Sequence, residues 1–463
     1  MTRAAVASRL AEIAGAPNVV LDPAQLAAYR IGSQTPSAAV RPASAQETAE
    51  IVKFAAAEKL AVVPSGARTK LGMGMPPRQY DLALDMTRLD RVVAYDPGDL
   101  TLGVEPGVTL RRLAGVLAEH RQFLPLAAPF MSQATIGGTI ASGMETPLRQ
   151  FYGTPRDYVL GIEFVTGEGL RAKGGGRVVK NVAGYDLHKL MIGALGTLGI
   201  LTTINFRTFP LPAATRIFLA ACGSAEAALE LRRRVALSPL RPLTVEILSP
   251  QAAEMLTSNV AARIEPGALP PALASKAQWV FAASFAGSEA VISRCDRELR
   301  RMAEQAATES AALLSADETS CLLGRVREFV PIALESSAAT TVVKLSVLPA
   351  RMNTMLSAAA KAADASELPW AAVARGVGVI YVALLPQARD DDARERVARA
   401  TGHLLAECAA VGGNAVIPWC PGEWKGALPV WGLPRRDFAQ MQKVKNAFDP
   451  PGILAPGRFA GGF

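Results

Sequence analysis

The chain has 463 residues, of which 50% are hydrophobic and 19% charged, and this balance excludes a disordered chain. Its 49 basic and 41 acidic residues leave a net charge of +8, and the arginines occur in short pairs rather than in one basic tract, so we expect no nucleic-acid partner. The five cysteines form no CxxC pair, which argues against a zinc ribbon or a ferredoxin-type cluster and is typical of thiols in a reducing compartment.

No targeting or membrane-spanning segment is expected. The N-terminal stretch meets Glu12 before any long apolar core, which argues against a signal peptide. The longest apolar run, 377–386, is too short to cross a bilayer. We therefore expect a cytoplasmic protein with no direct membrane span, which would reach the inner face of the membrane only through partners.

The first 212 residues predict an α+β arrangement of short elements. Residues 1–32 predict a helical segment, and Ser44 with Glu47 three residues later forms a capping-box pattern at the start of a further helix. Helical spacing also predicts helices at 109–119 and 187–192. Short apolar runs predict strands at 60–63, 82–84, 91–95, 101–105, 158–166 and 197–206.

Beyond Pro212 the chain predicts two similar sets of elements. The first has strands at 216–221, 243–248 and 278–284 and helices at 225–235 and 288–306; the second has strands at 341–347, 370–385 (a pair) and 414–419 and helices at 352–363 and 392–411. Each set approximates β-α-β-β-α-β, so we predict a ferredoxin-like antiparallel sheet with helices on one face. The expected domains are 1–32, 33–212, a cap domain at 213–440, and a returning C-terminal segment at 441–463.

Several common nucleotide-binding and catalytic motifs are absent from the sequence. It contains no GxGxxG, GxxxxGK[ST], HExxH or GxSxG, and His120, His188 and His403 are far apart. A Rossmann dinucleotide site, a Walker phosphate loop and a hydrolase triad are therefore unsupported. We also expect no metal site.

Two glycine-rich segments, far apart in the sequence, each adjoin a strand. The first is Pro64-Ser65-Gly66-Ala67-Arg68-Thr69-Lys70, and the second is Ala134-Thr135-Ile136-Gly137-Gly138-Thr139, which closes with Ser142-Gly143. Glycine lets a ligand approach backbone N–H groups, and successive N–H groups form an anion-binding nest. Each segment alone is more often only a turn, but two converging nests would clamp a diphosphate from both sides.

Further glycine-containing runs make the combination specific. They lie at 152–161, at 193–200 and at 180–187, which reads Lys-Asn-Val-Ala-Gly-Tyr-Asp-Leu. In order and spacing, residues 35–212 resemble the FAD-binding domain of the vanillyl-alcohol oxidase / p-cresol methylhydroxylase (PCMH-type) superfamily, with a short C-terminal match at 448–458. Within that superfamily, the run 180–187 looks most like the FAD-binding E subunit of bacterial glycolate oxidase.

The resemblance implies a two-part PCMH-type FAD-binding domain, with the flavin ring between it and the cap. It implies that segments 64–70 and 134–138 bind the diphosphate and that residues 142 and 143 lie near the flavin. It also implies that residues 153 and 157 lie at a strand entry near the cofactor, and that the backbone of residue 200 meets the adenine side. The implied cofactor-binding residues are Pro64, Ser65, Gly66, Ala67, Arg68, Thr69, Lys70, Ala134, Thr135, Ile136, Gly137, Gly138, Ser142, Gly143, Gly153, Asp157 and Ile200.

The chain departs from the family pattern at three places. Some members tether FAD covalently through a histidine in the first loop, but Ala67 and Arg68 stand here, so we expect non-covalent FAD. Ala455 stands where the family often has asparagine before Pro-Gly. The Glu-His-Gly motif of the catalytic 2-hydroxyacid dehydrogenases is missing, and the corresponding region, 420–426, reads Cys-Pro-Gly-Glu-Trp-Lys-Gly.

No side chain is identified as the catalytic base that oxidation of a 2-hydroxy acid requires. We expect His188 at the surface or as a helix cap, His403 packed or at the surface, and His120 in solvent. Lys180 is the best candidate for a cation that binds a carboxylate, although a strand-end lysine usually faces solvent. Three tryptophans are candidates to line a flavin pocket, with packing in the core or contact with a partner as the alternatives: Trp419, Trp424 and Trp431.

Cofactor residues thus outnumber catalytic candidates. The leading hypothesis is a FAD-binding subunit of a glycolate-oxidase-like complex that acts on a small 2-hydroxy acid and passes electrons to a second flavoprotein subunit and an iron–sulfur subunit. The first alternative is a self-sufficient FAD-dependent oxidoreductase on another small substrate, favoured by a cap longer than the resemblance to the E subunit implies. The second alternative is a non-catalytic scaffold that has lost the flavin.

Overall fold

The computed structural model describes residues 2–178, 184–270, 273, 278–306, 308–433 and 436–463. The first domain begins with α1 (Arg3–Ala14) and a four-stranded sheet. In spatial order that sheet consists of β1 (Val19–Val20), β2 (Ala38–Val40), β4 (Leu82–Asp85) and β3 (Val62–Ser65), and β2, β4 and β3 are parallel. The sheet and its helices share an apolar core.

The expected cap of the helix α3 (Ala45–Ala57) forms, with one difference. The Ser44 side chain accepts a hydrogen bond from the Glu47 amide, as the pattern predicts. The Glu47 carboxylate, however, accepts from the amide of Ala43 rather than from that of Ser44. The helix therefore begins where the sequence predicts it to begin.

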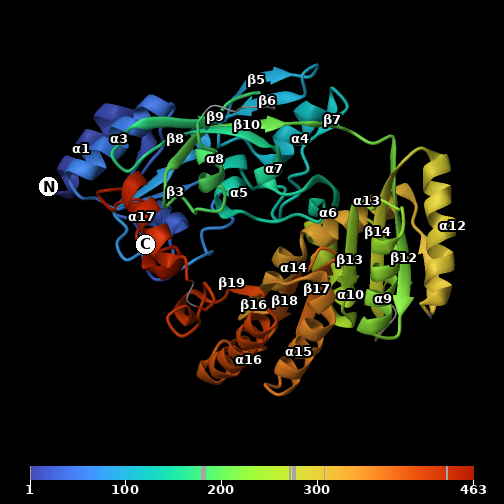
Figure 1. Ribbon diagram of the computed structural model, residues 1–463. Coiled ribbons are helices and arrows are strands. Elements are labelled where there is room, and N and C mark those ends of the chain that lie inside the picture. Colours follow the sequence, from blue (N-terminus) through green and yellow to red (C-terminus); the bar gives the residue numbers. More distant parts are fainter. Residues whose placement is uncertain (1, 179–183, 271–272, 274–277, 307, 434–435) are drawn as a thin grey trace.

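A second, five-stranded antiparallel sheet completes the first domain. Its order is β5 (Val92–Asp96), β6 (Thr101–Val104), β10 (Ile200–Arg207), β8 (Val159–Val165) and β9 (Arg171–Gly175). The helices α4 (Leu110–Ala118), α5 (Ile136–Ser142) and α8 (Leu187–Met191) accompany this sheet (Figure 1). Residues 179–183, which include Lys180, lie outside the described part of the chain.

The cap is one eight-stranded antiparallel sheet built from two halves. Its order is β15 (Ser310–Leu313), β12 (Ala214–Cys222), β14 (Trp279–Gly287), β13 (Thr244–Leu248), β17 (Trp370–Arg375), β18 (Val379–Leu384), β16 (Thr341–Ser346) and β19 (Asn414–Trp419). Each half runs β-α-β-β-α-β along the chain, and the halves meet where β13 pairs with β17. The predicted ferredoxin-like antiparallel cap and the α+β class are confirmed.

Helices lie on both faces of the cap sheet. The repeat helices α9 (Ala225–Leu237), α12 (Glu289–Gln305), α15 (Met352–Asp364) and α16 (Asp391–Ala410) share one core with the outer face, as expected. The inner face packs in a different core with α10 (Pro250–Thr257), α11 (Asn259–Ile264), α13 (Ala316–Arg327) and α14 (Phe329–Ser336). These four helices lie in the connections between repeat strands, where the sequence pattern predicts no element.

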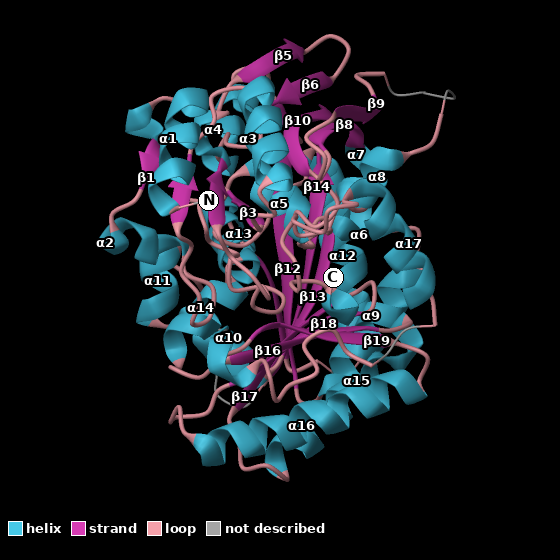
Figure 2. Cartoon of the chain, turned by 90° about the vertical axis from the view of Figure 1, so that its left-hand side faces the viewer, coloured by secondary structure: helices cyan, strands magenta, loops and turns pink. Residues whose placement is uncertain are grey.

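The C-terminal segment returns to the first domain after the cap is complete (Figure 2). It contains α17 (Phe438–Phe448), and Leu454 forms a parallel bridge with Val62 of β3. The buried Lys445 Nζ donates to the carbonyl oxygens of Thr197 (2.8 Å) and Leu454 (2.9 Å). The chain's end is thereby fixed beside the first glycine-rich segment.

Candidate functional site

The first glycine-rich segment follows β3 and leaves a run of backbone donors free. The amides of residues 67–70 have no hydrogen-bond acceptor among the described residues. The buried Oγ of Ser65 is likewise unpartnered. Arg68 has a φ of 64°, a left-handed conformation that helps the loop to turn. Buried donors without partners are uncommon, so this loop is suited to hold an anionic group.

The second segment is the start of a helix rather than the expected turn. Thr135 is the N-cap of α5, and its side chain accepts from the amide of Gly138 (3.3 Å). The amides of Ile136 and Gly137 donate to the carbonyl oxygens of Val108 and Pro106, both at 2.8 Å. The prediction of a second anion-binding nest is therefore wrong in this structure, because these N–H groups already donate hydrogen bonds to acceptors within the protein.

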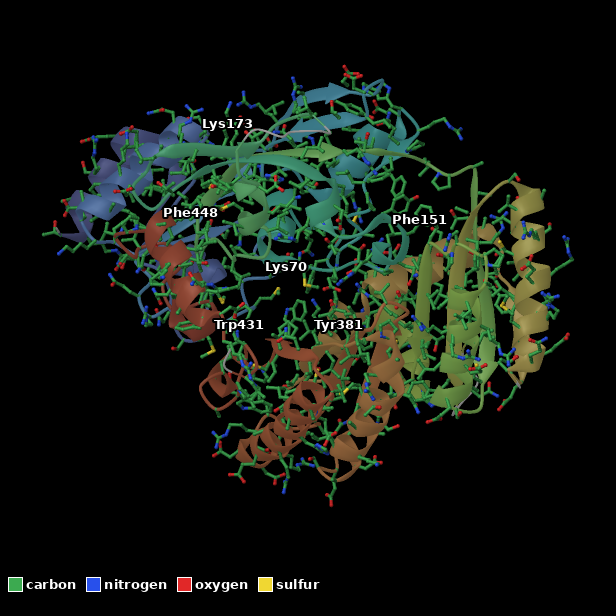
Figure 3. All side chains as sticks on the ribbon, viewed as in Figure 1. Lys70, Phe151, Lys173, Tyr381, Trp431 and Phe448 are labelled. Atoms are coloured by element: carbon green, nitrogen blue, oxygen red, sulfur yellow. The ribbon has the colours of Figure 1, made fainter. Side chains whose placement is uncertain are left out.

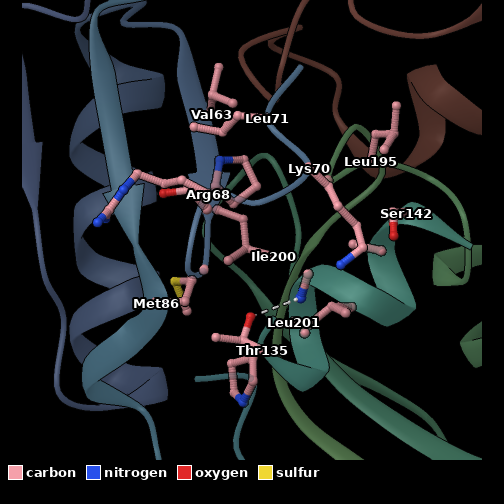
Figure 4. Close-up of a pocket in the computed structure, with 18 of the residues that line it drawn as sticks. Val63, Arg68, Lys70, Leu71, Met86, Thr135, Ser142, Leu195, Ile200 and Leu201 are labelled. Atoms are coloured by element: carbon pink, nitrogen blue, oxygen red, sulfur yellow. Dashed lines mark hydrogen bonds between the residues drawn. The ribbon is translucent and has the colours of Figure 1, made fainter. Parts of the chain in front are cut away.

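The two segments nevertheless lie against each other. A Cβ on Gly66 would overlap Thr135 Oγ1, and a Cβ on Gly137 would lie 2.5 Å from Pro106 Cβ. The glycines thus permit close approach of the first loop, α5 and the turn after β6. Between them is an open cleft (Figure 4).

Most of the predicted cofactor residues line this cleft, but not all of them. Ala134 and Ile136 are buried behind it, and Gly143 lines a second cavity instead. Gly153 and Asp157 line neither space, although their neighbours 154–156 line the second. The predicted residues in the wall of the cleft are Pro64, Ser65, Gly66, Ala67, Arg68, Thr69, Lys70, Thr135, Gly137, Gly138, Ser142 and Ile200.

Lys70 brings a nearly buried cation to the cleft. Its ammonium lies 5.5 Å from the ring centroid of Phe130 and 3.4 Å from Thr69 Oγ1. Burial lowers the pKa of Lys70 to about 8, although the negative charge of Glu328 by itself raises that pKa. Among the described residues this cation has no close counter-ion, which favours binding of an anion here.

Two buried cations from the C-terminal part hold the backbone that follows the first loop. Arg458 Nη2 donates to the carbonyl oxygens of Leu71 (2.9 Å) and Met73 (2.7 Å). Lys425 Nζ donates to those of Gly72 and Gly74. All four carbonyls of 71–74 are thus bonded to C-terminal side chains, and we name these contacts the carbonyl clamp. Burial lowers the pKa of Lys425 to about 8 and that of Arg458 to about 10.

A second and larger cavity, of about 460 Å³, lies between the first domain and the cap. Figure 3 shows Lys70, Tyr381 and Trp431 around this region, and Tyr381 and Trp431 line the cavity. Ser142 and Leu195 line both the cleft and the interdomain cavity, so the two spaces adjoin. The arrangement suits an elongated ligand that extends from the first loop to the cap.

An ion-pair network connects the two domains across this cavity. Lys344 Nζ on β16 lies 2.6 Å from a Glu145 oxygen, and Arg149 lies 2.7 Å from the other. Burial by itself raises the pKa of Glu145, but the charge and hydrogen bond of Lys344, with Arg149, outweigh burial and hold it below its ordinary value. Two cations share one carboxylate, which leaves positive charge for an anionic substrate.

The aromatic and histidine candidates are distributed as follows. Trp431 lines the interdomain cavity, whereas Trp419 and Trp424 are buried in the two cores of the cap. The expectation that His188 is at the surface or caps a helix is wrong: it lies within α8, is 4% exposed, and burial lowers its pKa.

The described residues contain no group of His, Cys, Asp and Glu side chains that could hold a metal ion.

Sequence reasoning missed several residues that line the two spaces. Glu145, Lys344 and Tyr381 lie in segments whose sequence predicts only a connection or an apolar strand. The available signal was a lone charged residue inside an apolar strand, as in Thr-Val-Val-Lys-Leu-Ser at 341–346. Arg458 of the C-terminal segment also lines the cleft.

Two family models match the chain in succession. The FAD binding domain matches residues 36–173, and the C-terminal domain of FAD linked oxidases matches 211–459. Residues 36–173 contain all of the predicted cofactor residues except Ile200.

The described part of the chain contains no helix long and apolar enough to cross a membrane.

Comparisons with individual proteins agree with these matches. The chain is 26% identical over 427 residues to glycolate oxidase subunit GlcD of Bacillus subtilis, covering 91% of this chain and 88% of that protein. It is 37% identical over 171 residues to glycolate oxidase subunit GlcE of Escherichia coli, covering 37% and 48%. It is 29% identical over 318 residues to D-2-hydroxyglutarate dehydrogenase of Xanthomonas citri, covering 68% and 66%.

Solved structures show the same fold at low sequence identity. Substrate-bound p-cresol methylhydroxylase superposes with a TM-score of 0.77 at 18% identity, covering 98% of this chain and 96% of that chain. A 4-ethylphenol oxidase from Gulosibacter chungangensis gives 0.76 at 18% identity, with the same coverage. The chain therefore belongs to the FAD-linked oxidases and is a flavoprotein of the PCMH-type fold.

Proposed function

We propose that the chain binds FAD non-covalently and oxidises a small 2-hydroxy acid as one subunit of a glycolate-oxidase-like complex. FAD would supply the two-electron acceptor when bound. The observation that carries the proposal is the juxtaposition of a donor-rich cleft with a positively charged interdomain cavity. The similarity to glycolate oxidase subunits and to a D-2-hydroxyglutarate dehydrogenase supports the substrate class.

The cleft is the proposed position of the diphosphate and adenosine parts of FAD. The free amides of residues 67–70 and the unpartnered Ser65 Oγ are donors for phosphate oxygens. Neither Ala67 nor Arg68 can form the covalent tether for which some members use a histidine. Denaturation by acid should therefore release all of the FAD into the supernatant, and flavin that stays with the precipitate would contradict non-covalent binding.

The interdomain cavity is the proposed substrate site. Lys344 and Arg149 share the single carboxylate of Glu145, so a substrate carboxylate can take part in the same network. Glu145 lies two residues beyond Gly143, on the side of the cavity that adjoins the cleft. Its low pKa keeps it ionised, so Glu145 positions Lys344 and Arg149 for the substrate carboxylate, whereas the same low pKa makes it a weak acceptor for the hydroxyl proton.

The direct test uses the FAD-loaded full chain without oxygen. Addition of glycolate or D-lactate should bleach the visible flavin absorbance, and replacement of Glu145 by Gln should slow the bleaching while FAD stays bound. A chain that fails to take up FAD, or whose flavin no 2-hydroxy acid bleaches even with partner subunits present, would overturn the proposal.

A second candidate is a self-sufficient FAD-dependent oxidoreductase. It is favoured by the complete cap, because the similarity to GlcD extends over 91% of this chain whereas that to GlcE covers 171 residues. Turnover of the isolated chain with an artificial electron acceptor, undiminished by the lack of other subunits, would support this candidate. Co-purification with a second flavoprotein and an iron–sulfur protein, and activity only together with them, would support the complex.

A further inference from the structure

A buried carboxylate of the cap holds a turn of the first domain. Glu328, between α13 and α14, is 3% exposed. Its Oε2 accepts from the backbone amide of Phe130 (2.7 Å) and its Oε1 from that of Met131 (3.0 Å). Hydrogen bonds from N–H groups to a carboxylate are charge-assisted and strong, so this side chain joins the cap firmly to a turn that lies 198 residues earlier in the chain.

The turn needs such support because of its backbone conformation. Phe130 has a φ of 65°, a left-handed conformation that is costly for a bulky residue and persists only where neighbouring groups fix it. Its carbonyl oxygen accepts from the amides of Gln133 (3.0 Å) and Ala134 (2.8 Å), directly before the Thr135 cap of α5. Glu328 therefore stabilises the turn that leads into the second glycine-rich segment.

The same turn covers the cation of the first loop. The Lys70 ammonium lies 5.5 Å from the centroid of the Phe130 ring, within the range of a cation–π contact. Burial lowers the pKa of this ammonium, and the negative charge of Glu328 acts in the opposite direction. On its other side Glu328 faces Arg327, whose Nε lies 3.0 Å from Oε1 and which also pairs with Glu265. The cap carboxylate thus acts on Lys70 both through the position of Phe130 and through its own charge.

We propose that Glu328 is a positioning residue of the cofactor cleft: from the cap, it fixes the turn at Phe130 over the Lys70 ammonium and so prepares that cation for an anionic ligand. The inference rests on the proposed function only in that it takes FAD as this ligand. Glu328 lines neither the cleft nor the interdomain cavity, so it acts through Phe130 and Lys70. Docking of the cap and readiness of the cleft for FAD then depend on each other.

The test measures the FAD affinity of the apoprotein against pH by fluorescence titration. Glu328→Gln keeps the size of the side chain and an acceptor for one amide but removes the charge. The ammonium then loses its proton more easily, so the pH at which FAD affinity falls should move below its position in the unchanged protein, which is about 8. At neutral pH the affinity should fall about three- to tenfold, because the lysine is retained but less favourably placed.

Three further variants make this test specific. Glu335→Gln, exposed on α14, is the matched control and should change neither the affinity nor its pH dependence. Glu328→Asp keeps the charge on a shorter side chain, so it should retain the pH position better than Glu328→Gln. In a Lys70→Met background, Glu328→Gln should no longer move the pH dependence, because the titrating group is gone. A side chain that merely stabilised the fold would act equally in both backgrounds.

Cleavage by chymotrypsin after Phe130 reports on the turn without any cofactor. In the apoprotein, both Glu328→Gln and Glu328→Asp should be cut there faster than the unchanged protein, whereas Glu335→Gln should not. If circular dichroism shows that Glu328→Gln does not fold, Glu328→Asp serves in its place, and normal cleavage together with normal FAD affinity in that variant would overturn the positioning role.

The outcomes separate this role from the proposed function. A moved pH dependence and faster cleavage in Glu328→Gln, in a chain whose flavin no 2-hydroxy acid bleaches, would leave the positioning role in place and defeat the proposed reaction. An unmoved pH dependence in Glu328→Gln, or the same change with and without Lys70, would overturn the positioning role even where the reaction proceeds.

Discussion

Lys70 shows how burial gives one side chain in the first loop a particular pH response. Its ammonium lies at the wall of the cleft without a close counter-ion, and its pKa is lowered to about 8. The diphosphate of FAD would provide the missing negative charge. Binding then favours the protonated lysine and takes up a proton where the free lysine is neutral.

FAD affinity should therefore fall as the pH rises through about 8. Lys70→Met should bind FAD about tenfold or more weakly near neutral pH, the value expected for loss of one charge-assisted contact, and should show a flatter pH profile. Fluorescence titration of the apoprotein measures both effects. Lys53→Met, on the exposed side of α3, is the control, and an unchanged profile in Lys70→Met would contradict the assignment.

Gly138 tests the shape of the cleft rather than its charge. A Cβ at this position meets only Thr135 Oγ1, at 3.2 Å, so a side chain fits there once the Thr135 side chain shifts by a few tenths of an ångström. Because Gly138 lines the cleft, Gly138→Leu should fill the space needed by FAD and yield a folded, colourless protein. The visible spectrum and circular dichroism check this result.

The matched control for Gly138→Leu is Gly402→Leu in the exposed part of α16, where a Cβ meets nothing. This variant should take up FAD like the unchanged protein. FAD uptake by Gly138→Leu with unaltered affinity would place the cofactor elsewhere.

At the scale of elements, the carbonyl clamp links Lys425, after the last cap strand, and Arg458 of the C-terminal segment to the loop that follows β3. Lys425→Met removes the donor from two carbonyls, at a cost of about 1–3 kcal/mol for buried acceptors left unbonded. FAD affinity should fall because the loop loses its fixed shape, and proteolysis within 71–74 should become faster. Lys361→Met, exposed on α15, should change neither; normal FAD affinity in Lys425→Met would show that the clamp does not position the loop.

The repeat elements were predictable because each combines an apolar period with a clear boundary. The helices α9, α12, α15 and α16 lie close to their predicted ranges, whereas β15, the last strand of the first set, has no such signal and was not predicted. Helix α5 was missed because its Ile-Gly-Gly-Thr start has low helical propensity, and the helix is instead fixed by the Thr135 cap and contacts with Pro106 and Val108.

The candidate site was predictable only where it depends on local sequence. The first loop was found because its glycines and its position after a strand are contiguous. Lys344 was missed because it is one charged residue in an apolar strand, and only strand register places it opposite Tyr381 at the cavity. The carbonyl clamp joins residues more than 350 positions apart, which no local pattern reveals.

At the scale of the whole molecule, the pair Lys344–Glu145 joins the cap to the first domain inside the cavity. Lys344→Met should destabilise the protein by about 1–3 kcal/mol, because it leaves the partly buried Glu145 carboxylate with Arg149 as its remaining ion-pair partner among the described residues. Adding Glu145→Gln should recover part of that loss, and urea unfolding of the two single variants and the double variant measures the coupling.

The pH dependence of this coupling has a definite sign. Lys344 helps to hold the pKa of Glu145 below its ordinary value, so the pair's contribution is present above the unfolded carboxyl's pKa and is lost as the pH falls. Strictly additive free energies in the two single variants and the double variant would show that the pair does not couple the domains.

The bridge between Leu454 and Val62 makes the cleft depend on two parts of the chain that are far apart in sequence. Leu454 completes the edge of the first sheet, and Arg458, four residues further on, both lines the cleft and fixes the loop that follows β3. A polypeptide without residues 449–463 therefore has an incomplete receptacle, and separately supplied residues 449–463 should restore it only if they can pair with β3.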